Sequence, residues 1–257
     1  MKLLDLTIDF TSDDAAANVA LDDALVETAD AELAGMAADC DGREFEILRL
    51  WEPPRPMVVL GRSSRVAAEV DVEVCRAVGV DIVRRASGGA TIVTGPGCLM
   101  YAVVLSYRLR PELRSIDAAH RFVLDTLAEA LRPLVPGIKR VGTSDLAVVD
   151  SAGGERKISG NSMRCRRDFL VYHGTLLYDF PLDLVGRLLR MPARQPEYRR
   201  GRTHGDFMTN LPVSGEALRS AVAAAFGATQ AATDWPREET TRLTREKYAT
   251  PQWTNLL

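Results

Sequence analysis

The stretch RRASGGATIVTGPGC (residues 84–98) constrains the fold most, because it sets a glycine-rich run between two apolar segments. It joins the expected strands VDIVRR (80–85) and LMYAVVLSYRL (99–109), and the second is apolar enough for the centre of a sheet. Glycines allow unusual backbone angles and let N–H groups face a bound anion. The run matches neither GxxxxGK[ST] nor GxGxxG, so a plain hairpin turn is as well supported by composition. Arg84 and Arg85 favour an anion site, because guanidinium groups suit carboxylate and phosphate.

Length and composition indicate an ordinary soluble globular protein. The chain has 257 residues, 46% hydrophobic and 26% charged, which is enough for a sizeable core. The net charge of -3 gives no general basic field for nucleic acid, and no apolar run approaches the ~20 residues of a membrane helix. Acidic residues interrupt MKLLDLTIDF (1–10), which is therefore a poor signal peptide. We expect a cytoplasmic protein that contacts neither nucleic acid nor membrane.

Helical and extended patterns are mixed along the whole chain. We expect strands at 1–10, 45–51, 57–62, 80–85, 99–109, 144–160 (a hairpin) and 168–180 (one long strand or a pair). We expect helices at 15–36, 70–79, 115–134, 214–227 and 237–248. With no internal repeat and no long linker, this order predicts one α+β (α/β) domain over residues 1–257, a single mixed β-sheet flanked by helices.

A lysine in the expected hairpin is the second sign of a site. In SDLAVVDSAGGERKISG (144–160), DLAVV forms one arm, DSAGGE the turn and RKISG the return. Lys157 is either an exposed strand residue or a cation directed into a site. The hairpin holds it near Asp145 at the same sheet end or face. Farther along, HGTLL (173–177) is expected to begin another strand.

Several motifs, in order and over most of the chain, resemble the lipoate–protein ligase family, in the superfamily of biotin and lipoate ligases and octanoyltransferases. The segments that carry the resemblance are NVALDDAL (18–25), LRLWEPPRPMVVLGRSSRVAAEVD (48–71), RRASGGATIVTGPGC, SDLAVVDSAGGERKISGNSMR (144–164), VYHGTLLYDF (171–180) and REKYATPQW (245–253). The resemblance implies a class II biotin–lipoate ligase-like catalytic domain. The chain ends soon after Trp253, so we expect no C-terminal accessory domain.

The implied reaction has two steps. Lipoate or octanoate attacks the α-phosphorus of ATP to form an acyl-adenylate, and a lysine of a lipoyl carrier domain then takes the acyl group. The resemblance gives Lys157 the central catalytic role, stabilising charge on the acyl carbonyl and α-phosphate in both steps. Asp145 would orient the incoming amine or bind Mg²⁺, which neutralises the pyrophosphate.

The resemblance also implies a set of binding residues. Arg85 with the N–H groups of Ser87, Gly88 and Gly89 would hold the phosphate and close the loop. The remaining implied positions of the acyl and nucleotide pocket are Ala90, Cys98, Gly160, His173, Gly174 and Thr175. Apolar runs of the neighbouring strands would line the acyl tunnel, where each buried CH₂ contributes about 0.8 kcal/mol.

Departures from the family pattern keep a rival reaction open. Ala90 replaces the third loop glycine, Cys98 stands where asparagine is frequent, and Ser144 replaces the asparagine before the aspartate. The four cysteines form no CxxC pair, so we expect reduced thiols and no structural zinc site. Octanoyltransferases of this fold use no ATP and carry the acyl group on a cysteine. Cys98 and Cys165 are the candidates, the second beside arginines that would lower a thiol pKa, although a packed Cys98 and an unreactive Cys165 are favoured.

Two further alternatives concern the function of the chain. A non-catalytic homologue that only binds a carrier is disfavoured by the intact Lys157, Arg85 and Ser87-Gly88-Gly89. A biotin ligase is disfavoured by the long lysine hairpin.

Segment 187–202 holds six arginines and one acid, a local charge of 6 − 1 = +5. It is either a solvated loop or a docking surface for an acidic lipoyl carrier domain, through Arg199 and Arg200. An accessory subunit on a separate polypeptide is a further expected partner.

Overall fold

The computed structural model describes residues 1–5, 14–149 and 153–257. Its strands are β1 Lys2–Asp5, β2 Ile47–Trp51, β3 Met57–Leu60, β4 Asp81–Arg84, β5 Ile92–Thr94, β6 Cys98–Ser106, β7 Lys139–Val141, β8 Asp145–Val149, β9 Glu155–Cys165, β10 Phe169–Leu177 and β11 Gln230–Ala231. Its α-helices are α1 Ala15–Ala34, α2 Val66–Glu69, α3 Val72–Ala77, α4 Ile116–Leu131, α5 Asp183–Leu188, α6 His204–Phe207, α7 Gly215–Ala225, α8 Arg237–Leu243 and α9 Pro251–Thr254. Short 3₁₀ turns cover Arg43–Phe45, Pro111–Arg114 and Glu197–Arg199, and a π-helical turn covers Thr244–Tyr248.

The main sheet is mixed and is built around β6. Its eight described strands run in the order β11-β1-β2-β6-β10-β9-β8-β7, parallel at the β11-β1-β2 end and antiparallel elsewhere. Every residue of β6 is buried, as the apolar run predicted for a central strand. The expected fold class, a mixed sheet flanked by helices, is confirmed.

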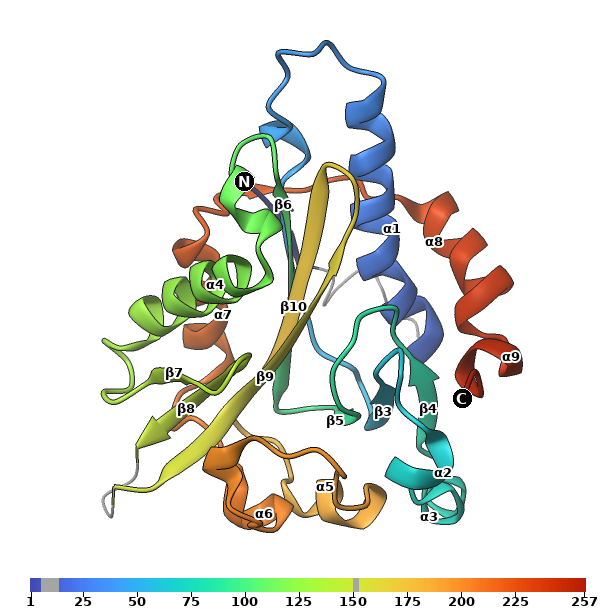
Figure 1. Ribbon diagram of the computed structural model, residues 1–257, viewed down its shortest axis with the longest axis vertical. Coiled ribbons are helices and arrows are strands. Elements are labelled where there is room, and N and C mark those ends of the chain that lie inside the picture. Colours follow the sequence, from blue (N-terminus) through green and yellow to red (C-terminus); the bar gives the residue numbers. More distant parts are fainter. Residues whose placement is uncertain (6–13, 150–152) are drawn as a thin grey trace.

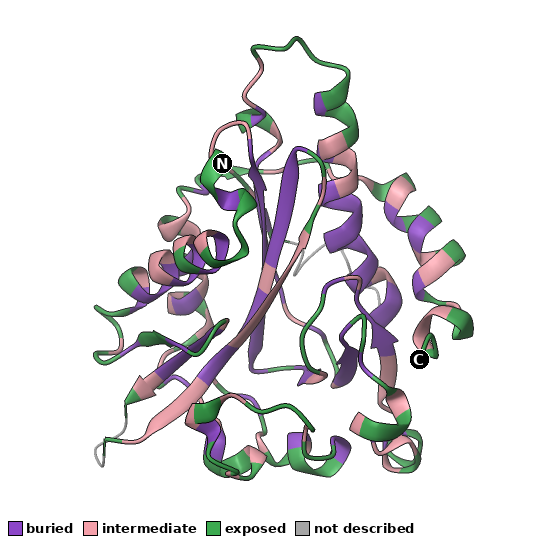
Figure 2. Cartoon of the chain, viewed as in Figure 1, coloured by how far each residue is buried: buried purple, intermediate pink, exposed green. Residues whose placement is uncertain are grey.

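Helices cover both faces of this sheet (Figure 1). Alternate residues of β6 point to opposite faces. Leu99, Tyr101 and Val103 pack in the cluster under α4 and α7, whereas Ala102 and Val104 pack against α1. Figure 2 shows β6, β10 and much of α1 as buried. α4 begins where predicted, because the Ser115 side chain accepts from the Ala118 N–H.

A second sheet, of three strands, was not expected. Its order is β4-β3-β5, with β3 parallel to β4 and antiparallel to β5. The glycine-rich run therefore contains a strand, Ile92–Thr94, and the single hairpin turn between VDIVRR and β6 is wrong. β-branched residues form this strand, although glycines on both sides obscure its pattern.

The lysine hairpin is confirmed in outline. β8 pairs with the first half of β9, and β10 pairs with its second half, so the return arm is much longer than RKISG. Part of the expected turn and of the first expected strand, residues 150–152 and 6–10, lies outside the described residues. β10 is one strand, and His173 lies in its middle rather than at a strand start. Within the described ranges, no helix has the length and apolar character needed to cross a bilayer.

Arg84 ties the small sheet to the end of the chain. Its side chain is fully buried. Its guanidinium donates to the backbone carbonyls of Gly61, Arg62, Ser64, Trp253 and Thr254. The Trp253 indole in turn donates to the Arg84 carbonyl over 2.8 Å. Arg84 is therefore a structural clamp, and the expectation that it binds an anion is wrong.

We predict that Arg84→Lys lowers the free energy of unfolding by about 3 kcal/mol, because an ammonium cannot satisfy all of these buried carbonyls. Urea denaturation measures the change. Arg76→Lys is the matched control, since Arg76 is exposed and pairs with Glu73 within its helix; it should change stability by less than about 0.5 kcal/mol. Equal effects of the two substitutions would contradict the clamp.

Candidate functional site

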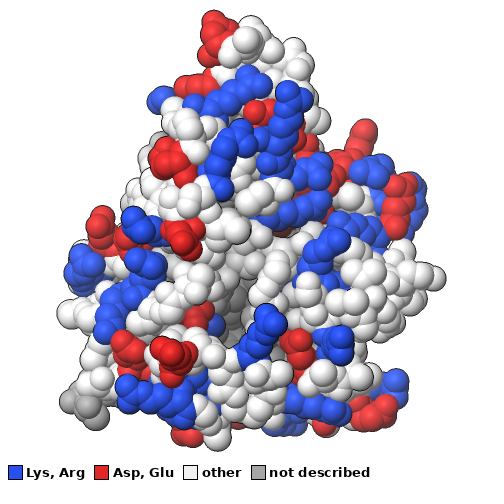
Figure 3. Space-filling model, in the orientation of Figure 1, with Lys and Arg blue, Asp and Glu red and all other residues white. Residues whose placement is uncertain are grey.

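A cavity of about 460 Å³ lies between β9, β10 and the small sheet. Figure 3 shows a hollow on this face with charged side chains at its rim. The predicted site residues that line the cavity are Arg85, Gly89, Ala90, Asp145, Lys157, Gly160, His173, Gly174 and Thr175. Ser87, Gly88, Cys98 and Cys165 are not among its lining residues.

Lys157 and Asp145 meet in this cavity, as the hairpin predicted. Lys157 Nζ lies 2.8 Å from Asp145 Oδ1, and both side chains are largely buried. A β-bulge between Leu146 and Ala147 shifts the pairing so that Asp145 lies opposite Gly160. A Cβ at Gly160 would lie 2.8 Å from Lys157 Nζ, so glycine leaves the room that the lysine side chain occupies.

The second oxygen of Asp145 is also engaged. Tyr198 Oη donates to Asp145 Oδ2 over 2.7 Å. Among the described residues, no group of three His, Cys, Asp or Glu side chains could hold a metal ion. Because Lys157 and Tyr198 already engage both oxygens of Asp145, this carboxylate does not fit a resident Mg²⁺ ion.

Arg85 lies in the glycine loop, residues 85–91 between β4 and β5, and its side chain binds within that loop. Its Nη2 donates to the carbonyls of Gly88 (2.6 Å) and Ala90 (2.9 Å), and its Nε donates to Ser87 Oγ (3.0 Å). Burial lowers the pKa of Arg85 to about 10, which leaves it charged at neutral pH. These donors are used within the loop, so Arg85 holds the shape of the loop, and direct phosphate binding through it has no support in this geometry.

A buried chain of hydrogen bonds fixes the loop to the main sheet. Ser87 Oγ lies 2.6 Å from His173 Nε2, and His173 Nδ1 lies 2.8 Å from Asp22 Oδ2. Asp22 Oδ1 accepts from Arg49 Nη1 over 2.6 Å. Burial alone would raise the pKa of Asp22, but the charge of Arg49 and hydrogen bonds from His173 and Arg49 hold it below its ordinary value. An ionised Asp22 can accept a hydrogen bond from both Arg49 and His173 Nδ1–H.

Gly174 and Thr175 help to seat Asn161 at the cavity floor. A Cβ at Gly174 would lie 1.8 Å from Asn161 Oδ1, so only glycine admits this side chain. Asn161 accepts from Tyr101 Oη over 2.5 Å and donates to the Ser144 carbonyl over 2.8 Å. Thr175 Oγ1 accepts from the Gly160 N–H over 3.2 Å.

The opposite wall of the cavity is apolar. It is made by Val19, Trp51, Val59, Ile92, Val93, Met100, Leu177, Val185 and Leu189. A hydrocarbon chain of several CH₂ groups would be stabilised here by about 0.8 kcal/mol per group. The cavity therefore pairs an apolar wall with an ammonium group and a glycine loop.

The cysteines are placed away from this chemistry. Cys98 is completely buried, and burial raises the pKa of its thiol to about 12, so it holds no thiolate at neutral pH. Cys165 is exposed at the far end of β9, and the extended residues between it and Lys157 span about 26 Å at roughly 3.3 Å each. The arginines beside it pair with carboxylates: Arg164 and Arg166 with Glu27, and Arg167 with Asp168.

The arginine-rich segment 187–202 forms part of the cavity rim. Arg190, Arg194 and Gln195 line it. Arg199 is 4% exposed, lies 4.8 Å from the Phe207 ring and donates to the Arg202 carbonyl. The expectation that Arg199 faces a partner is wrong, because its cation packs inside the segment; Arg187 and Arg200 are exposed.

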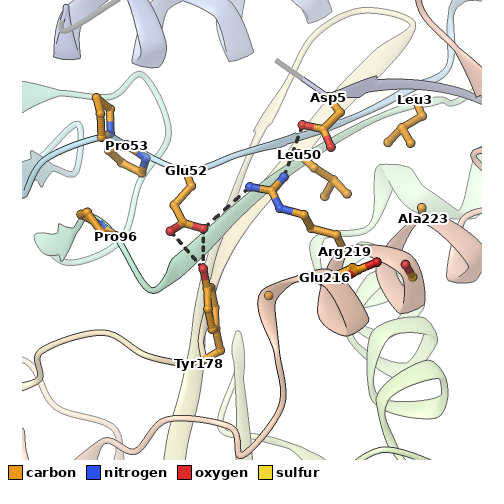
Figure 4. A pocket seen from close by; sticks show the side chains of 13 residues that line it. Leu3, Asp5, Leu50, Glu52, Pro53, Pro96, Tyr178, Glu216, Arg219 and Ala223 are labelled. Carbon is orange, nitrogen blue, oxygen red and sulfur yellow. Dashed lines mark hydrogen bonds and ion pairs between the residues drawn. The ribbon is translucent and has the colours of Figure 1, made fainter. Parts of the chain in front are cut away.

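A larger groove of about 900 Å³ lies elsewhere, between α7 and β1–β2. In Figure 4 its charged side chains face one another. Glu52 accepts from Tyr178 Oη over 2.9 Å, and Arg219 lies 3.3 Å from Asp5 and 3.7 Å from Glu52. None of the predicted site residues lines this groove, so size alone does not identify the site.

Sequence reasoning missed three residues of the site: Tyr198, Asp22 and Asn161. Asn161 and Asp22 stand inside the motifs ISGNS and NVALDD that carried the family resemblance, and this position was a usable signal. Tyr198 carries no such signal, because its partner Asp145 is 53 positions away.

Comparison with known proteins places this geometry in a family. The family model of the lipoyl protein ligase A/B catalytic domain matches residues 14–226. A putative lipoate-protein ligase A of Schizosaccharomyces pombe is 32% identical over 138 residues, covering 54% of this chain but only 35% of that protein. The octanoyltransferase LipM of Carboxydothermus hydrogenoformans is 25% identical over 277 residues, covering 96% of each chain.

Solved structures show the same fold. The bipartite lipoate protein ligase of Thermoplasma acidophilum, described with its E2 lipoyl domain, superposes with a TM-score of 0.76 at 21% identity and covers 100% of this chain and 96% of that one. A lipoate-protein ligase A bound with ATP gives a TM-score of 0.72 at 21% identity, covering 100% and 99%. Since the family model spans residues 14–226, the chain belongs to the lipoyl protein ligase A/B catalytic domain family and is an enzyme of the lipoate ligase and octanoyltransferase kind.

Proposed function

We propose that this enzyme is an ATP-dependent lipoate–protein ligase. A lipoate or octanoate carboxylate oxygen attacks the α-phosphorus of ATP, forming the acyl–O–P bond and breaking the bond to pyrophosphate. The neutral amine of a carrier lysine then attacks the acyl carbon. An amide forms, the acyl–oxygen bond breaks, and AMP and a proton leave.

The observation that carries the proposal is the Lys157–Asp145 pair set between a glycine loop and an apolar wall. A carboxylate and a triphosphate repel each other, so the first step needs a fixed cation between them. Lys157 would supply that charge at the acyl carbonyl and the α-phosphate, and preorganised groups of this kind contribute about 3–4 kcal/mol. The related ligase A structure bound with ATP supports nucleotide use by this fold.

The second candidate is ATP-independent octanoyl transfer, favoured by the full-length similarity to LipM. That reaction needs a nucleophile in the cavity. Neither Cys98 nor Cys165 lines it. Ser87, His173 and Asp22 are arranged like a nucleophile with its base, yet Ser87 is 3% exposed and its oxygen already accepts from Arg85. We therefore assign this chain of bonds to loop positioning and rank transfer below ligation.

The proposed protein substrate is an acidic lipoyl carrier domain. The exposed arginines of segment 187–202 lie on a segment that forms part of the cavity rim, where their charge would steer such a partner. The Thermoplasma relative is described as bipartite. By analogy we also propose that an accessory subunit assists this chain.

We predict that Lys157→Ala reduces kcat/KM for acyl-adenylate formation by about 100- to 1,000-fold, because it removes the cation at the reacting centre. The assay contains lipoate or octanoate, Mg·ATP and a lipoyl domain, and it measures pyrophosphate release and the mass of the domain. Lys139→Ala is the matched control, since Lys139 is a half-exposed lysine on β7.

In the same assay Cys98→Ser and Cys165→Ser should keep the wild-type rate. Octanoyl transfer from an acyl-carrier thioester without ATP, abolished by either cysteine substitution, would contradict the ligase and establish the transferase. A hydroxylamine-labile acyl adduct lost in Ser87→Ala would instead identify a serine-dependent transferase.

We predict that the double variant Arg187→Glu/Arg200→Glu raises the apparent KM for the carrier about tenfold at low salt and leaves acyl-adenylate formation unchanged, because steering acts on encounter alone. Arg121→Glu/Arg132→Glu, at exposed positions on α4 and directly after it, makes the same change in net charge away from the cavity. Equal carrier kinetics for the two double variants would exclude segment 187–202 as the docking surface.

A further inference from the structure

The carboxylate of Asp145 is held from two sides. Lys157 Nζ lies 2.8 Å from Oδ1, and Tyr198 Oη donates to Oδ2 over 2.7 Å. Asp145 is 7% exposed, so water has little access to this carboxylate. The position of the Lys157 ammonium therefore depends on Asp145, and that of Asp145 on Tyr198.

Tyr198 is itself fixed by the segment that carries it. Arg202 donates to the carbonyls of Tyr198 (2.7 Å) and Glu155 (2.8 Å), which ties the segment to the start of β9. The Tyr198 ring packs on Phe207 with centroids 5.0 Å apart. The Thr209 N–H donates to the Lys157 carbonyl over 2.9 Å. Both ends of the Tyr198–Asp145–Lys157 chain are thus anchored to the same strand.

The Tyr198 phenol keeps its proton and so remains a hydrogen-bond donor to Asp145. Burial, followed by the negative charge of Asp145 and the hydrogen bond to it, raises the pKa of Tyr198 well above its ordinary value. Tyr198 therefore stays protonated at neutral pH and can donate to the Asp145 carboxylate.

We propose that Tyr198 is a positioning residue for Lys157 and acts through Asp145. The inference rests on the proposed ligase function. A lysine ammonium sits on a flexible four-carbon stem, so a single carboxylate contact that can rotate leaves it several positions. A carboxylate that is held at both oxygens leaves the ammonium a single position. A cation preorganised in this way stabilises charge in the transition state without further rearrangement.

This arrangement joins two parts of the proposed reaction. Tyr198 belongs to segment 187–202, which we propose as the carrier-docking surface, and Lys157 acts in acyl activation. The segment that is proposed to meet the carrier therefore also holds the lysine in place. Loss of the phenol oxygen should consequently slow chemistry rather than weaken lipoate or ATP binding.

Tyr198→Phe tests the inference, because it removes the hydroxyl and keeps the ring on Phe207. We expect kcat of acyl-adenylate formation to fall about tenfold, the effect of one lost hydrogen bond to a charged group. KM for lipoate and for ATP should stay within about twofold of the wild type, and the melting temperature should fall no further than that of a control that loses a comparable hydrogen bond to a carboxylate. Tyr178→Phe is the matched control: it loses a hydrogen bond to the Glu52 carboxylate in the groove of Figure 4, away from the cavity, and should keep the wild-type kcat.

A double-mutant cycle tests whether Tyr198 acts through Asp145. In an Asp145→Ala background, Tyr198→Phe should have no further effect, because the group through which it acts is gone. An active wild type with an unchanged Tyr198→Phe variant, or an equal tenfold loss in both backgrounds, overturns this inference alone. A wild type that forms no acyl-adenylate overturns the proposed function and this inference with it.

Discussion

The buried ion pair between Arg49 and Asp22 is the interaction on which the site depends. Arg49 is fully buried, and besides Asp22 it binds Asn18 and lies 4.4 Å from the Trp51 ring. Such a pair is stable only when nearly all of its donors and acceptors are satisfied, because desolvation costs each ion several kcal/mol. Here the free oxygen of Asp22 is satisfied by His173, and His173 reaches Ser87. One desolvated charge pair thereby connects α1, β2, β10 and the glycine loop.

The cavity lies between the two sheets, and its lining divides into a polar and an apolar part. β9 and β10 contribute Lys157, Thr175 and the seat of Asn161, whereas the apolar side chains come from both sheets and from α1 and α5. An acyl chain with a charged head fits such a division, since the hydrocarbon and the carboxylate require opposite surroundings. The same division suits either of the activities named among the relatives, lipoate ligation and octanoyl transfer.

Much of the main sheet was predictable from local patterns. The apolar run of β6, the Ser115 cap of α4 and the meeting of Lys157 with Asp145 follow from alternation, capping and hairpin pairing. The small sheet was not predictable, because β5 has three residues inside a glycine-rich run. The roles of Arg84 and Arg199 were misjudged for a related reason. Sequence marks them as cations, and only tertiary contacts show that backbone carbonyls consume their donors.

The Arg84 clamp bears on how the enzyme matures during synthesis. Its partners Trp253 and Thr254 are about 170 positions later in the chain, so β4 emerges from the ribosome long before its cap exists. Until those residues appear, a buried guanidinium lacks several of its acceptors next to the glycine loop. The cavity should therefore be the last region to become ordered, and a nascent chain that stops short of Trp253 should carry a folded main sheet with an unfinished site.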